Sequence, residues 1–173
     1  MTKRYSGNII QGWKTESELE WMFEFAKRMS SVAEIGCWKG KGTHALLSGC
    51  RGTVTAIDPF DPANYGSSIK LANGDILEQF KYNLAAFSNL RIEQTTSEEF
   101  LIRHPRQKFD LVFLDGVKDY DGYVAELKRW LPKTKRVIAG YDYRNEEPVY
   151  VQKAVEDVIG KVNVLGAIWW KIL

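Results

Sequence analysis

A glycine-rich loop between two apolar runs is the part of this chain best suited to bind a ligand. The run at residues 32–35 leads into glycines at positions 36, 40 and 42, and the run at residues 53–57 ends at Asp58. Glycine has no Cβ, so such a loop lets the backbone approach a bound molecule closely. Asp58 follows Gly36 by 22 residues, a spacing that suits an acid binding a ribose diol. The pattern predicts a nucleoside-binding site.

The glycine spacing separates this loop from two phosphate-binding motifs. Dinucleotide sites have the pattern G-x-G-x-x-G, and a P-loop has Ser or Thr after its Gly-Lys pair. Here Gly40-Lys41 is followed by Gly42, and neither pattern is present. Glu34 stands at the mouth of the loop, where a carboxylate repels phosphate and attracts a cation. S-adenosylmethionine fits these features, because it carries an ammonium and a sulfonium and has no phosphate.

Further acids follow two later apolar runs. Residues 109–114 lead to Asp115, with Lys118 three positions later, and residues 136–139 precede Asp142. In open α/β sheets the ligand lies beyond the carboxyl ends of the strands, so we expect Glu34, Asp58, Asp115 and Asp142 around one crevice. Crowded carboxylates need positive charge to balance them. A ligand ammonium, a sulfonium or a divalent metal would supply it.

Together these motifs resemble those of class I S-adenosylmethionine-dependent methyltransferases. The pattern Glu34-x-Gly36-x-x-x-Gly40-x-Gly42, the Ile-Asp-Pro at 57–59 and the segment at 109–120 are most similar to small O-methyltransferases. That group includes catechol O-methyltransferase and the macrolide-sugar methyltransferases. The resemblance covers nearly the whole chain. It implies one domain over residues 1–173, with residues 1–30 forming an N-terminal lid and helix. The implied fold is α/β: a doubly wound, mainly parallel seven-stranded sheet with an antiparallel last strand.

The resemblance implies transfer of the methyl group of S-adenosylmethionine to an acceptor hydroxyl. Asp115 and Lys118 would be catalytic, with Lys118 removing the proton of the acceptor. A lysine does this only if burial or a nearby cation lowers its pKa. Many sugar methyltransferases have histidine at this place, whereas the catechol type has lysine. The expected cofactor contacts are Glu34, Gly36, Trp38, Gly40, Thr43, Asp58, Pro59, Ser97 and Asp115.

A divalent metal is a further expectation that the resemblance leaves open. Metal-using members of the group pair the acid after the fourth strand with two adjacent polar residues after the fifth. This chain has Tyr141-Asp142-Tyr143 there, so one of that pair is missing. Asp115 and Asp142 alone would leave most of an octahedral Mg²⁺ shell to water, substrate and Asn145.

Several of these residues also have a purely structural interpretation. The glycines could simply shape a tight turn, and Asp58-Pro59 could be ordinary turn chemistry. Ser97 could cap a helix instead of reaching the adenine, and Lys118 could be a solvated surface lysine. Aromatic residues suggest a ring or sugar acceptor, or else plain packing at the rim of the site. The residues expected to select the acceptor are Tyr5, Ile9, Ile10, Trp13, Tyr65, Tyr141, Tyr143 and Arg144.

Apolar periodicity predicts strands at residues 32–35, 53–57, 90–94, 110–114 and 136–139, and a terminal hairpin from 161–165 and 167–173. Helices are expected around Leu19 to Met29 with Thr15 or Ser17 as cap, and around Tyr123 to Trp130. Four more are expected at 42–48, 69–87, 97–103 and 149–159. This alternation of strands and helices predicts a mainly parallel sheet.

Composition narrows the class of protein further. A chain of 173 residues that is 45% hydrophobic can form one core. The net charge of +2 argues neither for nor against nucleic acid, but the sequence has no basic run, and we expect no nucleic-acid partner. No segment resembles a signal peptide or a membrane span, and Cys37 and Cys50 are expected to be reduced thiols of a cytoplasmic protein. A homo-oligomer is compatible with this composition.

Two other functions remain open from the sequence. One is a nicotinamide-dependent oxidoreductase, against which the glycine spacing argues. The other is a methyltransferase-like module that binds the nucleoside without catalysis. The expected partner of a catalytic chain is a small-molecule acceptor.

Overall fold

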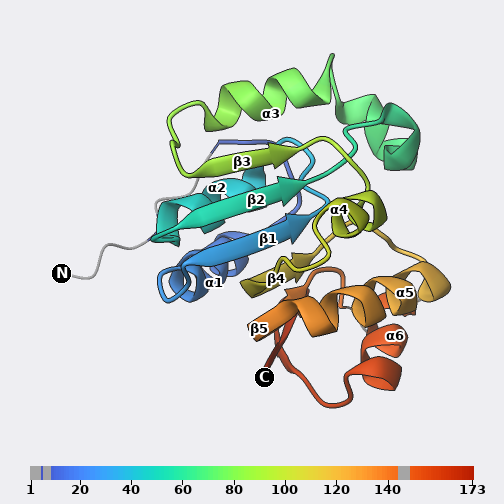
Figure 1. Ribbon diagram of the computed structural model, residues 1–173. Coiled ribbons are helices and arrows are strands. Elements are labelled where there is room, and N and C mark those ends of the chain that lie inside the picture. Colours follow the sequence, from blue (N-terminus) through green and yellow to red (C-terminus); the bar gives the residue numbers. More distant parts are fainter. Residues whose placement is uncertain (1–4, 6–8, 144–148) are drawn as a thin grey trace.

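Seven strands of the computed structural model, which describes residues 5, 9–143 and 149–173, form one sheet (Figure 1). The order is β3-β2-β1-β4-β5-β7-β6. Strands β1 to β5 run parallel to one another, whereas β7 runs antiparallel to β5 and to β6. The predicted fold class is confirmed. The strand bounds are β1 (Ser31–Ile35), β2 (Thr53–Ile57), β3 (Leu90–Glu93), β4 (Phe109–Leu114), β5 (Thr134–Gly140), β6 (Asn163–Leu165) and β7 (Ile168–Ile172).

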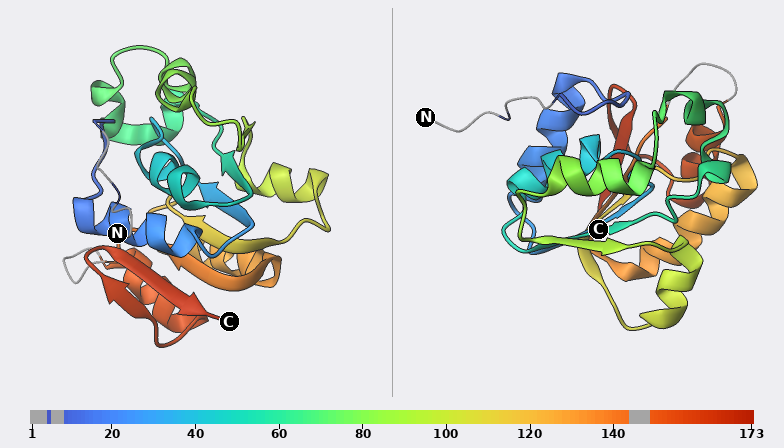
Figure 2. Two further views of the ribbon diagram at one scale, coloured as in Figure 1. Left: turned by 90° about the vertical axis from the view of Figure 1, so that its left-hand side faces the viewer. Right: turned by 90° about the horizontal axis from the view of Figure 1, so that it is seen from above.

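Helices cover both faces of this sheet (Figure 2). Apolar residues of α1, α2 and α3 pack into one core, and those of α4, α5 and α6 pack into the other. Because both faces are covered, the central strands are apolar almost throughout, as is typical of parallel sheets. The helix bounds are α1 (Glu16–Ala26), α2 (Lys41–Gly49), α3 (Ile76–Leu84), α4 (Ser97–Arg103), α5 (Tyr120–Trp130) and α6 (Tyr150–Val158), with 3₁₀ helices η1 (Pro62–Leu71) and η2 (Leu131–Lys133).

Alternation along β1 decides which core each side chain enters. Val32 belongs to the core under α1 and α2, whereas Ala33 and Ile35 belong to the core under α4 and α5. Successive side chains of a strand point to opposite faces, so Glu34 points to the same side as Val32. The one acid within this strand therefore lies on the side of α1, α2 and the N-terminal segment.

The predicted helix at residues 69–87 is wrong. The chain forms η1 up to Leu71, and α3 begins only at Ile76. Asn73 and Gly74 have φ angles of 49° and 112°, and such left-handed residues interrupt a helix. Asp75 then caps α3, because its side chain accepts a hydrogen bond from the Glu78 amide at 3.0 Å.

The capping predictions have mixed outcomes. Thr15 caps α1, as expected, and forms a capping box with Glu18. Ser97 does not cap α4, because the cap is Thr96, whose hydroxyl accepts from the Glu99 amide at 3.2 Å. Cys37 and Cys50 are buried free thiols, as expected.

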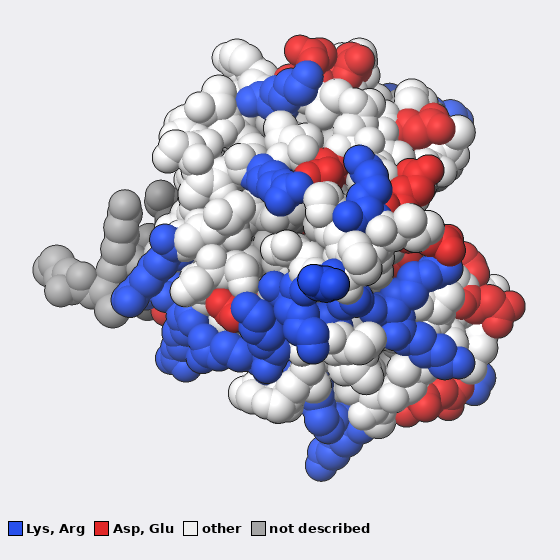
Figure 3. Space-filling model, in the orientation of Figure 1, with Lys and Arg blue, Asp and Glu red and all other residues white. Residues whose placement is uncertain are grey.

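Basic side chains gather on one face of the molecule although the sequence has no basic run (Figure 3). Arg136 donates a hydrogen bond to the Arg28 carbonyl, and Lys135 pairs with Asp110 at 3.4 Å. These residues lie at the amino ends of β4 and β5 or beside them, at the opposite edge of the sheet from the carboxyl ends. No helix among the described residues combines the length and the apolar character that crossing a bilayer requires.

Candidate active site

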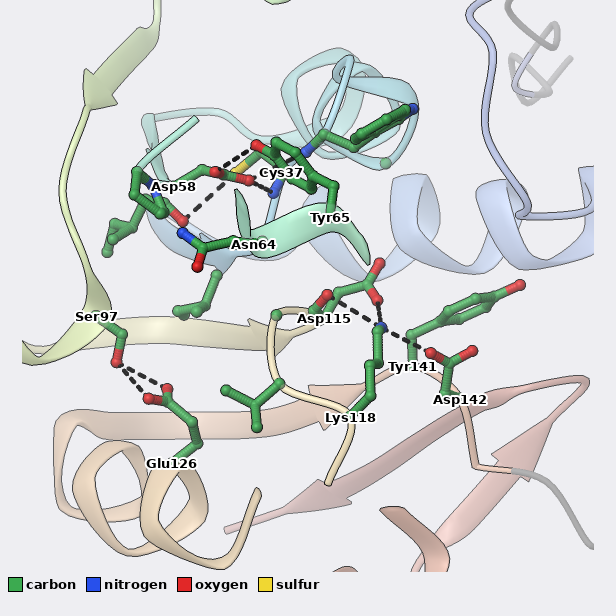
Figure 4. Close-up of a pocket in the computed structure, with 18 of the residues that line it drawn as sticks. Cys37, Asp58, Asn64, Tyr65, Ser97, Asp115, Lys118, Glu126, Tyr141 and Asp142 are labelled. Carbon is green, nitrogen blue, oxygen red and sulfur yellow. Dashed lines mark hydrogen bonds and ion pairs between the residues drawn. The ribbon is translucent and has the colours of Figure 1, made fainter. Parts of the chain in front are cut away.

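A cavity of ≈ 970 Å³ lies at the carboxyl ends of β1, β2, β4 and β5 (Figure 4). Its size suits a small-molecule ligand. The N-terminal segment at residues 12–14 forms part of its wall, as do the loop after β1 and the residues that follow β4 and β5. The predicted residues that line it are Gly36, Trp38, Asp58, Pro59, Ser97, Asp115, Lys118 and Asp142. Three predicted cofactor contacts, Glu34, Gly40 and Thr43, do not line this cavity.

Gly36 is required by the close approach of two backbone segments. Its φ is +83°, and a Cβ there would lie 2.6 Å from the Asp115 carbonyl oxygen and from the Gly116 backbone. The Asp115 amide donates to the Ile35 carbonyl at 2.7 Å, which ties the ends of β1 and β4 together. The close packing of these two segments is therefore sufficient to explain a glycine at position 36, without any ligand. This packing also places Asp115 beside the loop that follows β1.

Asp58 organises the glycine loop through four hydrogen bonds (Figure 4). Its Oδ2 accepts from the amides of Cys37 at 2.7 Å and Trp38 at 3.2 Å. Its Oδ1 accepts from the amide of Phe60 and the hydroxyl of Tyr65, both at 2.7 Å. A carboxylate has about four acceptor positions, so these donors use them all. A ribose hydroxyl could bind Asp58 if it replaced the hydroxyl of Tyr65, the only side-chain donor of the four.

Asp115 carries two lysines, one on each carboxylate oxygen. Lys14 pairs with its Oδ2, and Lys118 lies 2.6 Å from its Oδ1. Lys118 Nζ is also 2.6 Å from Oδ2 of Asp142 (Figure 4). Burial raises the pKa of Asp115, but the attraction of Lys118 and Lys14 outweighs this, so the pKa is lowered overall. Asp115 is therefore ionised and already balanced by positive charge.

These contacts oppose the predicted role of Lys118 as a base. Burial lowers the pKa of Lys118, but Asp115 and Asp142 raise it more, and the net shift is upward. A lysine base needs the opposite shift. Half of the side chain is exposed, yet the ammonium is bound by two carboxylates. The lowered pKa that a lysine base requires is not found in this arrangement.

Glu34 lies behind the cavity wall in a buried position. Its Oε2 accepts a hydrogen bond from the Thr43 hydroxyl at 2.5 Å. The hydroxyl of Thr43 therefore binds this carboxylate. Burial raises the pKa of Glu34 to about 7, although Lys14 and Thr43 act in the opposite direction. A Cβ on Gly42 would lie 2.6 Å from its Oε1, so Gly42 is needed for this carboxylate to fit against α2.

Lys14 is the site residue that the sequence did not predict. It lines the cavity, its side chain is 10% exposed, and its ammonium lies over the rings of Tyr141 at 4.5 Å and Phe113 at 5.6 Å. Asp115 and Glu34 both raise its pKa, and they overcome the effect of burial. It stands 101 residues before Asp115 in a polar segment. Nothing local distinguishes it from a solvated lysine.

Ser97 lines the cavity, but its hydroxyl is bound by other side chains of the protein. Its Oγ donates to the Glu126 carboxylate, 2.7 and 2.8 Å from the two oxygens, and accepts from Trp130 Nε1 at 3.1 Å. This buried group joins α4 to α5. Ser97 therefore shapes the wall of the cavity through Glu126, which also lines it.

The residues expected to select the acceptor divide into two groups. Trp13, Tyr65 and Tyr141 line the cavity, and Trp13 packs on Trp38 with ring centroids 5.6 Å apart. Four of the others lie elsewhere in the described structure. Tyr5 bonds His44, Tyr143 bonds Glu156, Ile9 is fully exposed and Ile10 packs against the core. Arg144, like the candidate metal ligand Asn145, lies outside the described residues.

The described residues do not fit a divalent metal. No group of three or more His, Cys, Asp or Glu side chains within them could hold one. The two predicted ligands, Asp115 and Asp142, do come together, but around the ammonium of Lys118. The pair is thus bridged by an ammonium group of the chain itself.

Comparison with known proteins identifies the family. Residues 33–137, more than half of the chain, match the model of the family described as methyltransferase domain. No curated protein sequence matches the chain.

Solved structures share the fold at low identity. An O-methyltransferase from Bacillus cereus in complex with SAH has a TM-score of 0.61 and 16% identity, over 92% of this chain and 82% of that one. The O-methyltransferase TomG from Streptomyces achromogenes, in complex with SAM, has a TM-score of 0.65 and 12% identity, over 92% and 81%. An SAH-bound methyltransferase from Podospora anserina has a TM-score of 0.60 and 16% identity, over 91% and 78%. The chain belongs to the methyltransferase-domain family and has its Rossmann-like fold.

Proposed function

We propose that this methyltransferase transfers the methyl group of S-adenosylmethionine to a hydroxyl oxygen of a small molecule. One observation carries the proposal: the acids at the strand ends already hold an organic ammonium, that of Lys14, inside a cavity of ligand size. The neighbours in complex with SAM or SAH and named O-methyltransferases support the cofactor and the class of acceptor.

The cavity offers partners for each part of this cofactor. Asp115, with Glu34 behind it, would hold the cofactor ammonium in the place that Lys14 now fills. Asp58, which accepts the hydroxyl of Tyr65, would accept a ribose hydroxyl. The adenine of the cofactor would be surrounded by residues of the cavity wall, namely Pro59, Trp38 and the Ser97–Glu126 pair. When bound, S-adenosylmethionine supplies a methyl group on a positively charged sulfur, already activated for displacement.

The chain must then align the acceptor and take up its proton. We assign the uptake of the acceptor proton to Asp142, because this residue lines the cavity and its side chain is 26% exposed. Its φ of 60° places it in the left-handed region, a conformation that Asp adopts more readily than most residues and that is concentrated at functional sites. The acceptor oxygen would gain the methyl group as the methyl–sulfur bond of the cofactor breaks and leaves a neutral thioether, and the acceptor proton would pass to the Asp142 carboxylate and then to water.

Transfer of a labelled methyl group to a panel of phenols, catechols and sugars tests this function. We expect methylation of hydroxyl acceptors, and an Asp142→Asn variant should lower kcat about 100-fold or more while binding of S-adenosylmethionine is kept. The exposed Asp121→Asn variant serves as control. Cofactor binding without transfer to any acceptor would favour a non-catalytic module. An absence of cofactor binding would refute the proposal.

A further inference from the structure

The two acids that would hold a metal lie at the ends of neighbouring strands. Asp115 follows β4 directly, Asp142 follows β5 after one residue, and these strands pair up to Leu114 and Gly140. Two carboxylates directed at one point attract a cation. Figure 4 shows which cation they have: the ammonium of Lys118, from the loop that follows Asp115, lies between them.

The contacts of Lys118 use its full capacity to donate hydrogen bonds. An ammonium has three N–H donors. Lys118 Nζ contacts Asp115 Oδ1 at 2.6 Å, Asp142 Oδ2 at 2.6 Å and the Asp115 carbonyl oxygen at 3.1 Å. No donor is left over for an acceptor molecule. Lys118 therefore acts by fixing the two carboxylates, which makes it a positioning residue.

A metal ion at this point would have to displace more than one group. Oδ1 of Asp115 is bound by Lys118 and its Oδ2 by Lys14, so both oxygens are occupied by ammonium groups. Mg²⁺ binds oxygens at about 2.0–2.1 Å in octahedral geometry. It could not reach Asp115 while Lys118 holds one oxygen and Lys14, or a ligand ammonium in its place, holds the other, and it would be repelled by each of these cations.

The charge of the cluster also favours a site without metal. Glu34, Asp115 and Asp142, when all are ionised, face the ammonium groups of Lys14 and Lys118, which leaves one negative charge. A ligand ammonium that replaces Lys14 on Asp115 leaves this carboxylate balanced by two ammonium groups, as before. A divalent metal would instead add two positive charges to the cluster.

We propose that the ammonium of Lys118 takes the place of a divalent metal in this chain, and that its methyl transfer is metal-independent. The inference rests on the proposed function. Lys118 holds Asp142 in the orientation in which it meets the acceptor hydroxyl, and it contributes the positive charge that a metal would contribute near the reacting oxygen.

The test measures metal binding and methyl transfer separately. Mg²⁺ and Mn²⁺ are titrated calorimetrically into the wild-type chain loaded with S-adenosylmethionine, and transfer rates are measured with EDTA and with Mg²⁺. We expect no metal binding at millimolar concentration and rates equal within about twofold. The Lys118→Ala variant should lose about tenfold or more in kcat with little change in KM for the cofactor, and added Mg²⁺ should restore part of the loss.

Two further variants test whether the loss is due to the positive charge of Lys118. Lys118→Arg keeps the positive charge and should retain more activity than Lys118→Ala. Lys128→Met, at an exposed lysine of α5, should behave as wild type. If Lys118→Ala does not fold, the wild-type titration and the arginine variant still decide the question.

The outcomes separate this inference from the proposed function. Wild-type transfer that requires Mg²⁺, or tight binding of Mg²⁺ to the wild-type chain, would overturn the inference and leave the function intact. Undiminished activity of Lys118→Ala in EDTA would also overturn it. A chain that transfers no methyl group with or without metal would instead refute the function.

Discussion

At the scale of single residues, the site is filled by the chain's own groups. The ammonium of Lys14 lies on Asp115, and the hydroxyl of Tyr65 lies on Asp58. These are the chemical groups, an ammonium and a hydroxyl, with which a methionine nucleoside would bind the same two acids. Ligand binding therefore has to exchange one set of contacts for another, and the affinity depends on the strength of the internal set.

Removing the hydroxyl of Tyr65 tests this exchange. The Tyr65→Phe variant frees one acceptor position on Asp58, so S-adenosylmethionine should bind more tightly, by about threefold to tenfold. Asp58→Asn should instead weaken binding, because the amide loses an acceptor and adds donors. Calorimetry on both variants measures the effect. Weaker binding by Tyr65→Phe would mean that this hydroxyl contacts the ligand itself.

Burial of Glu34 predicts a pH dependence of stability. Its pKa is about 7 in the folded chain, compared with 4.5 for an ordinary glutamate. Between these values the unfolded chain has released the proton while the folded chain keeps it, so stability falls as pH rises and then levels off above 7. The fall should be on the order of 3 kcal/mol, since each pKa unit corresponds to about 1.4 kcal/mol.

The Glu34→Gln variant should remove this fall. Urea unfolding at a series of pH values measures the free energy of unfolding of the variant and of wild type. The control is Glu78→Gln, at a side chain that is 68% exposed. An unchanged pH profile in Glu34→Gln would show that another group is responsible.

At the scale of elements, the loop after β1 is set by packing against the loop after β4. A Cβ on Gly36 would meet the Asp115 and Gly116 backbone at 2.6 Å, and its φ is +83°. Gly36→Ala should therefore lower the free energy of unfolding by about 2–5 kcal/mol. Gly160 has φ +76°, and a Cβ there would have no atom within 4 Å, so Gly160→Ala should cost only about 1 kcal/mol. Equal losses in chemical denaturation would contradict this explanation.

Most of the elements could be predicted from the sequence, because the central strands β1, β4 and β5 contain short apolar runs and most helices have an apolar face. The helix predicted at 69–87 failed where apolar residues continued across a turn. Asn73-Gly74 is a strong turn signal, and Asp75 is a good cap. The turn and the helix cap formed by these three residues therefore divide the segment, although the apolar periodicity around them continues.

The three acids that line the cavity, Asp58, Asp115 and Asp142, could also be predicted, since each one follows a strand and parallel strands end at one edge. The partners of these acids could not. Lys14 and Tyr65 reach Asp115 and Asp58 from segments with no periodic signal. Which oxygen a flexible lysine or tyrosine occupies depends on three-dimensional packing, and sequence spacing does not contain it.

At the scale of the whole molecule, the parallel strands bring the acids of the site to one edge of the sheet. Asp58, Asp115 and Asp142 line the cavity at the carboxyl ends of the strands, whereas Lys135 and its partner Asp110 lie at the amino ends of β5 and β4. The fold thus gathers carboxylates where a cationic nucleoside would bind. The central claim, that this edge binds S-adenosylmethionine, belongs to this scale.

Calorimetric titration of the chain with S-adenosylmethionine and with NAD⁺ tests that claim most directly. The Asp58→Asn variant is titrated in parallel to place the binding at this cavity. We predict binding of S-adenosylmethionine to wild type, weaker binding to the variant, and no binding of NAD⁺ to either. A preference for NAD⁺, or no heat with S-adenosylmethionine, would contradict the account.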